Sequence, residues 1–136
     1  MKKTILITHR LPREHFAELE AQFEVLIPCE ERFSKEEFQR LLPRIDGMIA
    51  STALRVTDEM MALAPRLKII ASYGVGYDNI DLAAAQRRGI VVTNNPTPVL
   101  EPTAEHAYAL MLAVAHRIPE CDRDLRRGEV KWGIMD

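Results

Sequence analysis

The feature that most constrains the fold is a regular alternation of short apolar runs with longer amphipathic stretches. Short runs rich in β-branched and aliphatic residues predict strands at residues 4–8, 25–27, 48–50, 67–71 and 90–93. A stretch with helical periodicity follows each run. Such alternation places successive strands parallel in one sheet, with helices on both faces. The sequence therefore predicts an α/β fold with a doubly wound parallel sheet of about five strands.

Capping residues mark the ends of several predicted helices. Ser34 and Glu37 form a capping box, and Thr57 is suited to cap the helix that follows it. Gly89 ends the helix that begins near Leu82. Ligands of doubly wound sheets lie at the carboxyl ends of the strands, so a site is expected in the loops that follow strands.

The last predicted element is a single long helix from about Thr103 to about Arg126, after a loop with three prolines. A helix that is apolar nearly all round needs cover on several sides. This favours an interface with a second domain or a second subunit, and an ordinary core helix is the alternative. The apolar residues concerned are Ala104, Ala107, Tyr108, Leu110, Met111, Leu112, Ala113, Val114 and Ala115.

Composition disfavours several classes of protein. The net charge of -2 gives no bias toward nucleic acid or anionic membranes. No apolar run is long enough to cross a bilayer and no secretory signal is visible, so a cytoplasmic protein is expected. Cys29 and Cys121 have no Cys or His at metal-ligand spacing, so neither a metal site nor a disulfide is expected.

The fourth predicted strand leads into residues 72–78, Ser-Tyr-Gly-Val-Gly-Tyr-Asp. Gly74 and Gly76 can turn successive backbone N–H groups toward one point, which makes a nest for an anion. The N-terminus of the following helix would add its partial positive charge. A carboxylate or a phosphate suits this position, and a plain turn is the alternative.

A dinucleotide-binding fingerprint is rejected for the same loop. Asn79 stands where the third glycine of the fingerprint belongs, and the loop follows the fourth strand instead of the first. The next strand ends in Thr93, Asn94 and Asn95, which offer no acid for a ribose.

Several blocks of residues together carry a family resemblance. Residues 73–81 are followed by Ala-Ala at 83–84, Arg-Gly-Ile at 88–90, Val-Thr-Asn at 92–94 and Thr-Ala-Glu-His at 103–106. In order and spacing, residues 67 to about 128 resemble the D-isomer-specific 2-hydroxyacid dehydrogenases. The first 66 residues resemble this family only in architecture.

The resemblance implies a domain organisation and an activity. Residues 1–101 would form a flavodoxin-like substrate-binding domain. Residues 102–136 would form the hinge and dimerisation helix and the start of an NAD-binding domain. The parent protein would be an NAD(P)-dependent homodimer that reduces a 2-keto acid resembling glyoxylate or hydroxypyruvate.

The resemblance also assigns substrate-binding residues. The N–H groups of Val75 and Gly76 would hold the substrate carboxylate. Leu54 would shape the pocket, and Arg55 would pair with an anionic substituent or be an ordinary solvated arginine. The full substrate-binding set is Leu54, Arg55, Tyr73, Gly74, Val75 and Gly76.

Val75, Leu100 and Thr103 would border the cofactor, NAD or NADP. Leu100 departs from the family, because many members have a threonine there. The change would either remove a polar contact near the cofactor or reshape the loop, which Pro98 and Pro102 already stiffen. We also expect Trp132 to help wall an active site, of this chain or of a partner subunit.

No catalytic residue is assigned in this chain. The family's glycine-rich motif and its catalytic arginine, acid and histidine are expected beyond residue 136, so the chain alone is expected to be inactive. His9, His15, His106 and His116 are not assigned that role. The alternatives are a non-enzymatic flavodoxin-like module that binds an anion or a partner, and a relative of phosphite dehydrogenases or corepressors.

Overall fold

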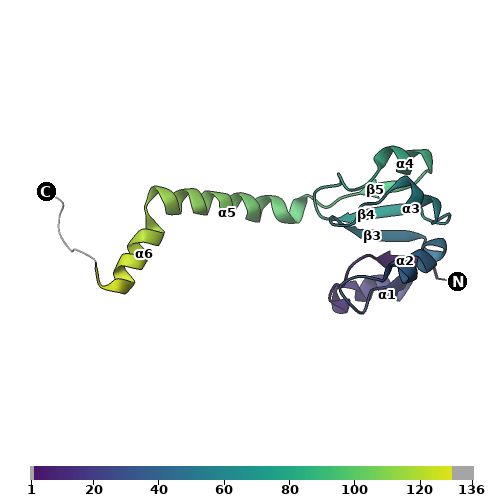
Figure 1. Cartoon of the computed structure of the whole chain (residues 1–136), viewed down its shortest axis with the longest axis horizontal. Helices are drawn as coiled ribbons and strands as arrows, with labels where there is room; N and C mark the ends of the chain where they lie inside the picture. Colours follow the sequence, from purple (N-terminus) through teal and green to yellow (C-terminus); the bar gives the residue numbers. More distant parts are fainter. Residues whose placement is uncertain (1, 130–136) are drawn as a thin grey trace. The chain divides into compact units, whose positions relative to one another are not determined.

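Within the described residues, 2–129, the chain forms a five-stranded parallel sheet in the order β2-β1-β3-β4-β5 (Figure 1). The structure is a computed structural model. Its strands are β1 (Thr4–Ile7), β2 (Glu24–Leu26), β3 (Gly47–Ser51), β4 (Ile69–Tyr73) and β5 (Val91–Thr93). The direction of chain progression reverses between β1 and β3, so the switch point lies at their carboxyl ends. The predicted flavodoxin-like sheet is confirmed.

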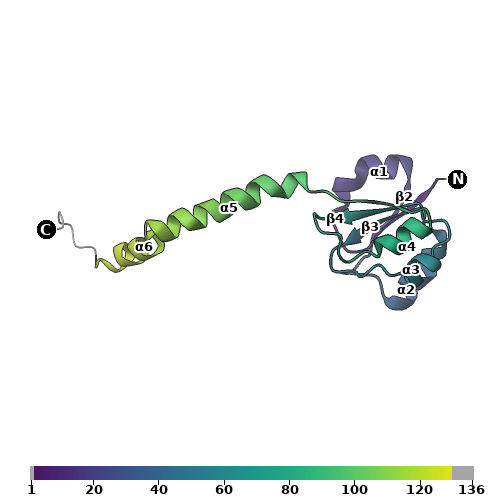
Figure 2. The ribbon, with the colours of Figure 1, turned by 90° about the horizontal axis from the view of Figure 1, so that it is seen from above.

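The chain divides into two compact units, Met1–Pro96 with the sheet and Thr97–Asp136 with the last two helices. In the first unit, helix α1 lies on one face of the sheet and α2, α3 and α4 lie on the other (Figure 2). A short 3-10 turn, Arg13–Phe16, precedes α1, and another, Leu42–Arg44, continues α2. The helices are α1 (Ala17–Gln22), α2 (Lys35–Leu41), α3 (Asp58–Ala62) and α4 (Leu82–Arg87).

The hydrophobic core is a row of strand residues that packs against helices and loops. Leu6, Met48 and Ile70 are paired across β1, β3 and β4, and all three are fully buried. Burial of each such side chain contributes about 1.5–3 kcal/mol. The cluster is completed by Leu42, Ile45, Ala50, Val56, Met61, Ala64, Leu67, Ile80, Ala84, Ala85 and Ile90.

The predicted helix caps at Ser34 and Thr57 are confirmed. The Ser34 hydroxyl accepts a hydrogen bond from the Glu37 N–H at 3.2 Å, and the Thr57 hydroxyl accepts one from Met60 at 3.3 Å. Asp81 caps α4 in the same way, because its carboxylate accepts the N–H of a residue three positions on. Each cap satisfies a backbone donor that the first helical turn leaves without a partner.

The start of the C-terminal helix differs from the prediction. Helix α5 (Thr97–Ala115) begins inside the segment that was expected to be a loop, six residues before Thr103. Pro98 is tolerated because it lies in the first turn, where the backbone N–H has no helical partner. Pro102 removes one hydrogen bond, to the carbonyl of Pro98 at the very start of the helix.

The expectation of one unbroken helix to Arg126 is also wrong. A separate helix, α6 (Ile118–Arg127), follows α5 after a two-residue break. Pro119 has no N–H to donate to the carbonyl of Ala115, and its ring disfavours a continuous helix. Arg117 adopts a left-handed conformation with φ of 53°, which turns the chain between the helices.

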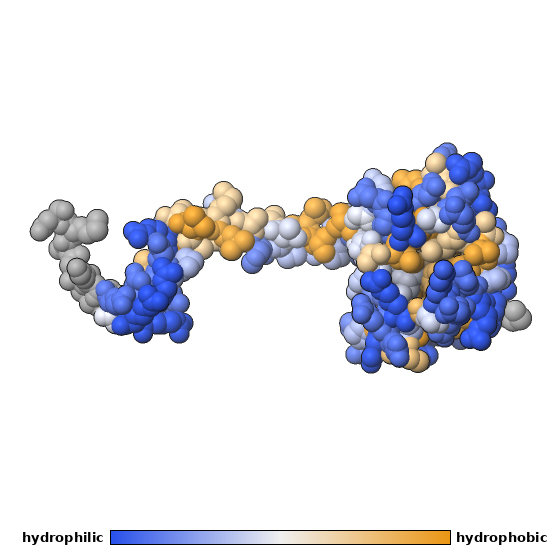
Figure 3. Space-filling model, in the orientation of Figure 1, coloured by the Kyte–Doolittle hydropathy of each residue, from blue (hydrophilic) through white to orange (hydrophobic). Residues whose placement is uncertain are grey.

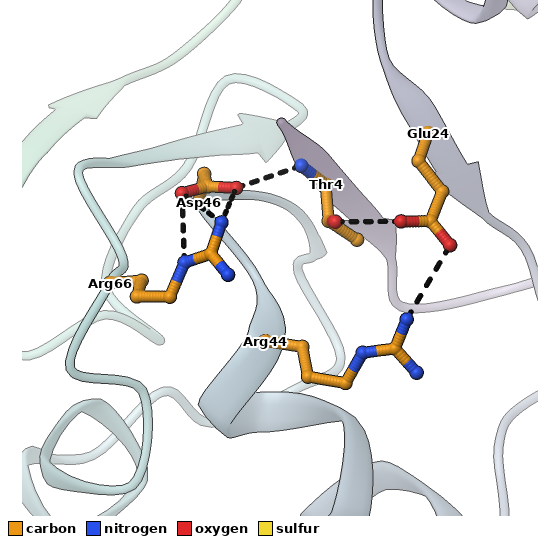
Figure 4. A network of polar contacts seen from close by, with 5 residues as sticks. All are labelled: Thr4, Glu24, Arg44, Asp46 and Arg66. Carbon is orange, nitrogen blue, oxygen red and sulfur yellow. Dashed lines mark hydrogen bonds and ion pairs between the residues drawn. The ribbon is translucent and has the colours of Figure 1, made fainter. Parts of the chain in front are cut away.

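A polar network fixes the amino-terminal ends of three strands (Figure 4). The Asp46 carboxylate accepts hydrogen bonds from the Thr4 N–H and from Arg66, both at 2.8 Å. The Thr4 hydroxyl donates to Glu24 at 2.9 Å, and Arg44 lies 3.6 Å from the Glu24 carboxylate. The network joins β1 and β2 to the turn that begins β3.

The environment of Asp46 favours its charged form. Burial of the carboxyl would raise its pKa, but the hydrogen bond from Thr4 and the guanidinium of Arg66 outweigh that effect. The pKa of Asp46 therefore lies below its ordinary value.

Candidate functional site

The loop that follows β4 lies at the carboxyl edge of the sheet. Tyr73 is the last residue of β4 and is paired with Ser51, the last residue of β3. The buried Ser72 hydroxyl donates a hydrogen bond to the Gly76 carbonyl at 2.8 Å. This bond draws residues 74–76 back over the end of their own strand, so the loop is a defined turn.

Two asparagine side chains fix the loop to its neighbours. The Asn79 amide donates to the carbonyls of Ser51 at 3.2 Å and Leu54 at 2.7 Å. The Asn94 amide donates to the Val75 carbonyl at 2.8 Å. Asn79 thus joins the loops after β3 and β4, and Asn94 joins the loop after β4 to the end of β5.

This arrangement leaves the backbone N–H donors of the loop available. The carbonyls of Val75 and Gly76 are both engaged by side chains. Within the described part of the chain, the N–H groups of Val75 and Gly76 donate to no protein acceptor. Two successive exposed N–H groups are the donors that a carboxylate needs.

Gly74 is required by the close approach of the loop after β3. A Cβ atom at this position would lie 2.9 Å from Cγ2 of Thr52, and the backbone φ is 158°. The Gly74 carbonyl also accepts a hydrogen bond from the Asn95 N–H at 3.0 Å. A side chain here would push apart the two loops that Asn79 holds together.

The helix N-terminus contributes less than the sequence suggested. Helix α4 begins at Leu82, and the Asp81 carboxylate already accepts one of its first free N–H groups, that of Ala84. The carboxylate of Asp78 lies 3.9 Å from the Cβ position of Gly76. The positive end of α4 is thus partly neutralised by Asp81, and Asp78 adds a further negative charge near the loop.

The remaining predicted substrate residues lie on the loop after β3. Leu54 is half-buried and packs against the core, so it can form a fixed wall. Arg55 is exposed and lines a small pocket of about 210 Å³ with Asp78, Asn79 and neighbouring residues. The structure thus places Arg55 beside the loop after β4.

The predicted cofactor residues are divided between the two units. Val75 belongs to the first unit and has an exposed apolar side chain next to its unpaired N–H. Leu100 and Thr103 belong to α5 in the second unit and are exposed. Trp132 lies outside the described residues.

Sequence reasoning did not assign roles to Asn79 and Asn94, or to the contact that His9 makes. The His9 and Tyr73 rings meet edge to face, with centroids 5.1 Å apart. Burial, and then the positive charge of Arg32, lower the pKa of His9 below its ordinary value. His9 is therefore neutral near pH 7.

Neither a metal site nor a membrane segment emerges from residues 2–129. No cluster of three or more His, Cys, Asp or Glu side chains that could hold a metal ion occurs there. No helix in this range is sufficiently long and apolar to span a bilayer. Cys29 and Cys121 are free and exposed.

Taken together, the fold and the loop define a parallel α/β domain with two unpaired backbone N–H groups, those of Val75 and Gly76, at its carboxyl edge. The sequence profile of the D-isomer-specific 2-hydroxyacid dehydrogenase catalytic domain matches residues 5–121. The chain belongs to this family of oxidoreductases.

Individual relatives agree with this assignment. A glyoxylate reductase of Pyrococcus furiosus is 41% identical over 132 residues, which are 96% of this chain and 39% of that protein. This chain also resembles the structure of a 2-hydroxyacid dehydrogenase from Ketogulonicigenium vulgare, with a TM-score of 0.82 and 30% identity. The match covers 98% of this chain and 44% of that protein's chain.

A third relative is an NADPH-dependent glyoxylate/hydroxypyruvate reductase from Sinorhizobium meliloti in complex with NADP and malonate. The match covers 95% of this chain and 39% of that protein's chain, with a TM-score of 0.70 and 28% identity. The chain thus spans about two fifths of the length of the relatives that it matches.

Proposed function

We propose that this chain is the substrate-binding part of an NAD(P)-dependent oxidoreductase that acts on the CH–OH group of D-2-hydroxy acids. In the reducing direction the substrate is a small 2-keto acid of the glyoxylate or hydroxypyruvate kind. The observation that carries the proposal is the pair of unpaired N–H groups at Val75 and Gly76. Membership of the 2-hydroxyacid dehydrogenase family supports the reaction class.

The loop binds the carboxylate of the substrate and leaves its carbonyl free. The N–H groups of Val75 and Gly76 donate to the two carboxylate oxygens. Tyr73 and Leu54 limit the space around the rest of the molecule, which favours short substrates. Arg55 borders the pocket and attracts a second anionic group, where the substrate has one.

The residues present fit a nicotinamide cofactor in part. The exposed apolar side chain of Val75 suits the face of a nicotinamide ring, and Leu100 and Thr103 have exposed side chains on α5. NAD or NADP, when bound, supplies or accepts the hydride. This chain's own residues bind and orient the acid.

Residues 102–136 act as the hinge and the dimerisation segment in this proposal, and residues 1–101 as the substrate domain. The support is the apolar surface along α5, which the space-filling view shows as a series of apolar patches (Figure 3). Tyr108, Met111 and Val114 are 63%, 65% and 75% exposed. Large apolar surface of this kind marks an interface, here with a second copy of the chain.

The chain by itself binds the acid and is expected not to turn it over, because no catalytic residue is assigned among its residues. A test is the titration of the isotopically labelled 136-residue chain with oxalate, which carries a carboxylate like that of glyoxylate. The backbone amide signals of Val75 and Gly76 are expected to shift and saturate. Chloride at equal ionic strength is the control.

Two outcomes would contradict the proposal. One is that oxalate leaves both amide signals in place, and the other is that it shifts only signals of residues far from the loop. A separate assay mixes the chain with NADH and hydroxypyruvate, and we expect no oxidation of NADH. Turnover in that assay would show that the chain contains its own proton donor.

A further inference from the structure

His9 and Tyr73 come from strands that are not neighbours. β3 lies between β1 and β4 in the sheet, yet the two rings meet at 5.1 Å. The residue of β3 at this level is Ser51, which is paired with Tyr73. Its small side chain leaves room for two rings to meet above the strand, which a large side chain would fill.

The chain after β1 is held in place for this contact. The Thr8 N–H donates to the Ile49 carbonyl at 3.0 Å, and the Thr8 hydroxyl accepts from the Ser51 N–H at 2.8 Å. Both bonds tie the residue before His9 to β3. The backbone that leads into His9 is therefore fixed to β3 by one main-chain bond and one bond to the Thr8 hydroxyl.

The His9 ring also carries an unusual feature. Its Nδ1 atom is buried and has no hydrogen-bond partner within residues 2–129. A buried polar atom without a partner costs free energy, so its presence calls for an explanation. The contact that the structure shows for this ring is the edge-to-face packing against Tyr73.

Tyr73 is the residue that connects this contact to the loop. It is half exposed, and it directly precedes Gly74, so its ring and backbone set the entry of the chain into the anion-binding turn. A shift of the Tyr73 backbone would move the N–H groups of Val75 and Gly76, which follow it in the chain. A group that fixes Tyr73 therefore fixes the donors.

We propose that His9 is a positioning residue for substrate binding, which holds Tyr73, and through it the loop N–H groups, by aromatic packing above Ser51. This inference rests on the proposed function, because it concerns the same carboxylate site. His9 acts through its ring face and edge, and it needs no contact with the substrate. An aromatic replacement should therefore preserve the effect and an aliphatic one should not.

The test is a set of oxalate titrations on the full 136-residue chain, followed through the Val75 and Gly76 amide signals. His9→Leu is expected to raise the dissociation constant about threefold to tenfold, the range that corresponds to an aromatic pair. His9→Phe is expected to stay within about twofold of the wild type. A spectrum with native dispersion confirms the fold of each variant, and His9→Gln replaces His9→Leu if the latter is unfolded.

A double-mutant cycle separates positioning from a merely structural role. In a Tyr73→Leu background, His9→Leu is expected to have no further effect on the dissociation constant for oxalate. Equal effects of His9→Leu in both backgrounds would overturn the inference, as would wild-type affinity in the single variant. If the wild-type chain bound no oxalate, the proposed function would fail and this inference with it.

Discussion

The side-chain amide of Asn94 donates a hydrogen bond to the carbonyl oxygen of Val75, at 2.8 Å. The bond links the end of β5 to the turn after β4. The bond orients the Val75 carbonyl, and because the carbonyl and the N–H of a trans peptide unit point in opposite directions, the Gly76 N–H points away from Asn94. A contact between two loops thus determines which groups of the turn face a ligand.

Replacement of Asn94 with alanine should weaken oxalate binding while the fold is retained. The loss of one hydrogen bond of this kind corresponds to about 1 kcal/mol, or about a fivefold rise in dissociation constant. Isothermal titration calorimetry measures the change. Asn95→Ala is the matched control, because Asn95 contacts the loop through its backbone N–H. Equal losses in both variants would argue against a specific role for the Asn94 amide.

Replacement of Gly74 with alanine should disrupt the turn through a steric contact with Thr52. The new Cβ would lie 2.9 Å from Cγ2 of Thr52, closer than such atoms approach. We expect the amide signals of Val75 and Gly76 to move and oxalate binding to fall at least about fivefold, as for a strained core contact of about 1–3 kcal/mol. The double variant with Thr52→Ser lacks Cγ2 and should recover part of the affinity. No recovery would mean that backbone conformation, and not contact with Thr52, requires the glycine.

A fall in pH should lower the stability of the folded chain, partly through protonation of Asp46. Its pKa is lowered in the folded state, so the stability that it contributes is present above its ordinary pKa of about 3.9 and is lost as the pH falls through the folded value. At pH 7, Asp46→Asn should cost about 1–3 kcal/mol in urea unfolding. The difference in free energy of unfolding between the wild type and Asp46→Asn should become smaller below about pH 4.

An exposed acid provides the comparison for Asp46. Glu30→Gln should alter the free energy of unfolding at pH 7 by no more than about 0.5 kcal/mol. The contrary result is that the free energies of unfolding of the wild type and Asp46→Asn differ by the same amount from pH 7 to strong acid. That result would show that the charge of Asp46 is not what stabilises the strand ends.

The sheet could be predicted from sequence because its signals are local. Each strand is a short aliphatic run, and Ser34, Thr57 and Gly89 mark helix ends by chemistry that acts within four residues. The proline-rich start of α5 was misjudged because Pro98 and Pro102 fall where a helix tolerates them. The break at Arg117 follows from Pro119, a signal that was present and outweighed by the apolar pattern before it.

The glycine turn of the site was also visible in the sequence, but its supports were not. Asn79, Asn94 and His9 act on residues 15 or more positions away in the chain, or on two loops at once. Such contacts depend on strand order, which joins β1, β3 and β4 at one edge. The type of a residue and its spacing from its neighbours in the sequence do not indicate that strand order.

The most direct test of the central claim is a chimera in which residues 5–121 replace the matching segment of the Pyrococcus furiosus glyoxylate reductase. That enzyme is 41% identical to this chain and provides the parts that this chain does not contain. We expect the chimera to oxidise NADH or NADPH in the presence of glyoxylate, and Gly74→Ala to raise its KM for glyoxylate. A chimera that folds and binds the nucleotide, but shows no glyoxylate-dependent oxidation, would contradict the account.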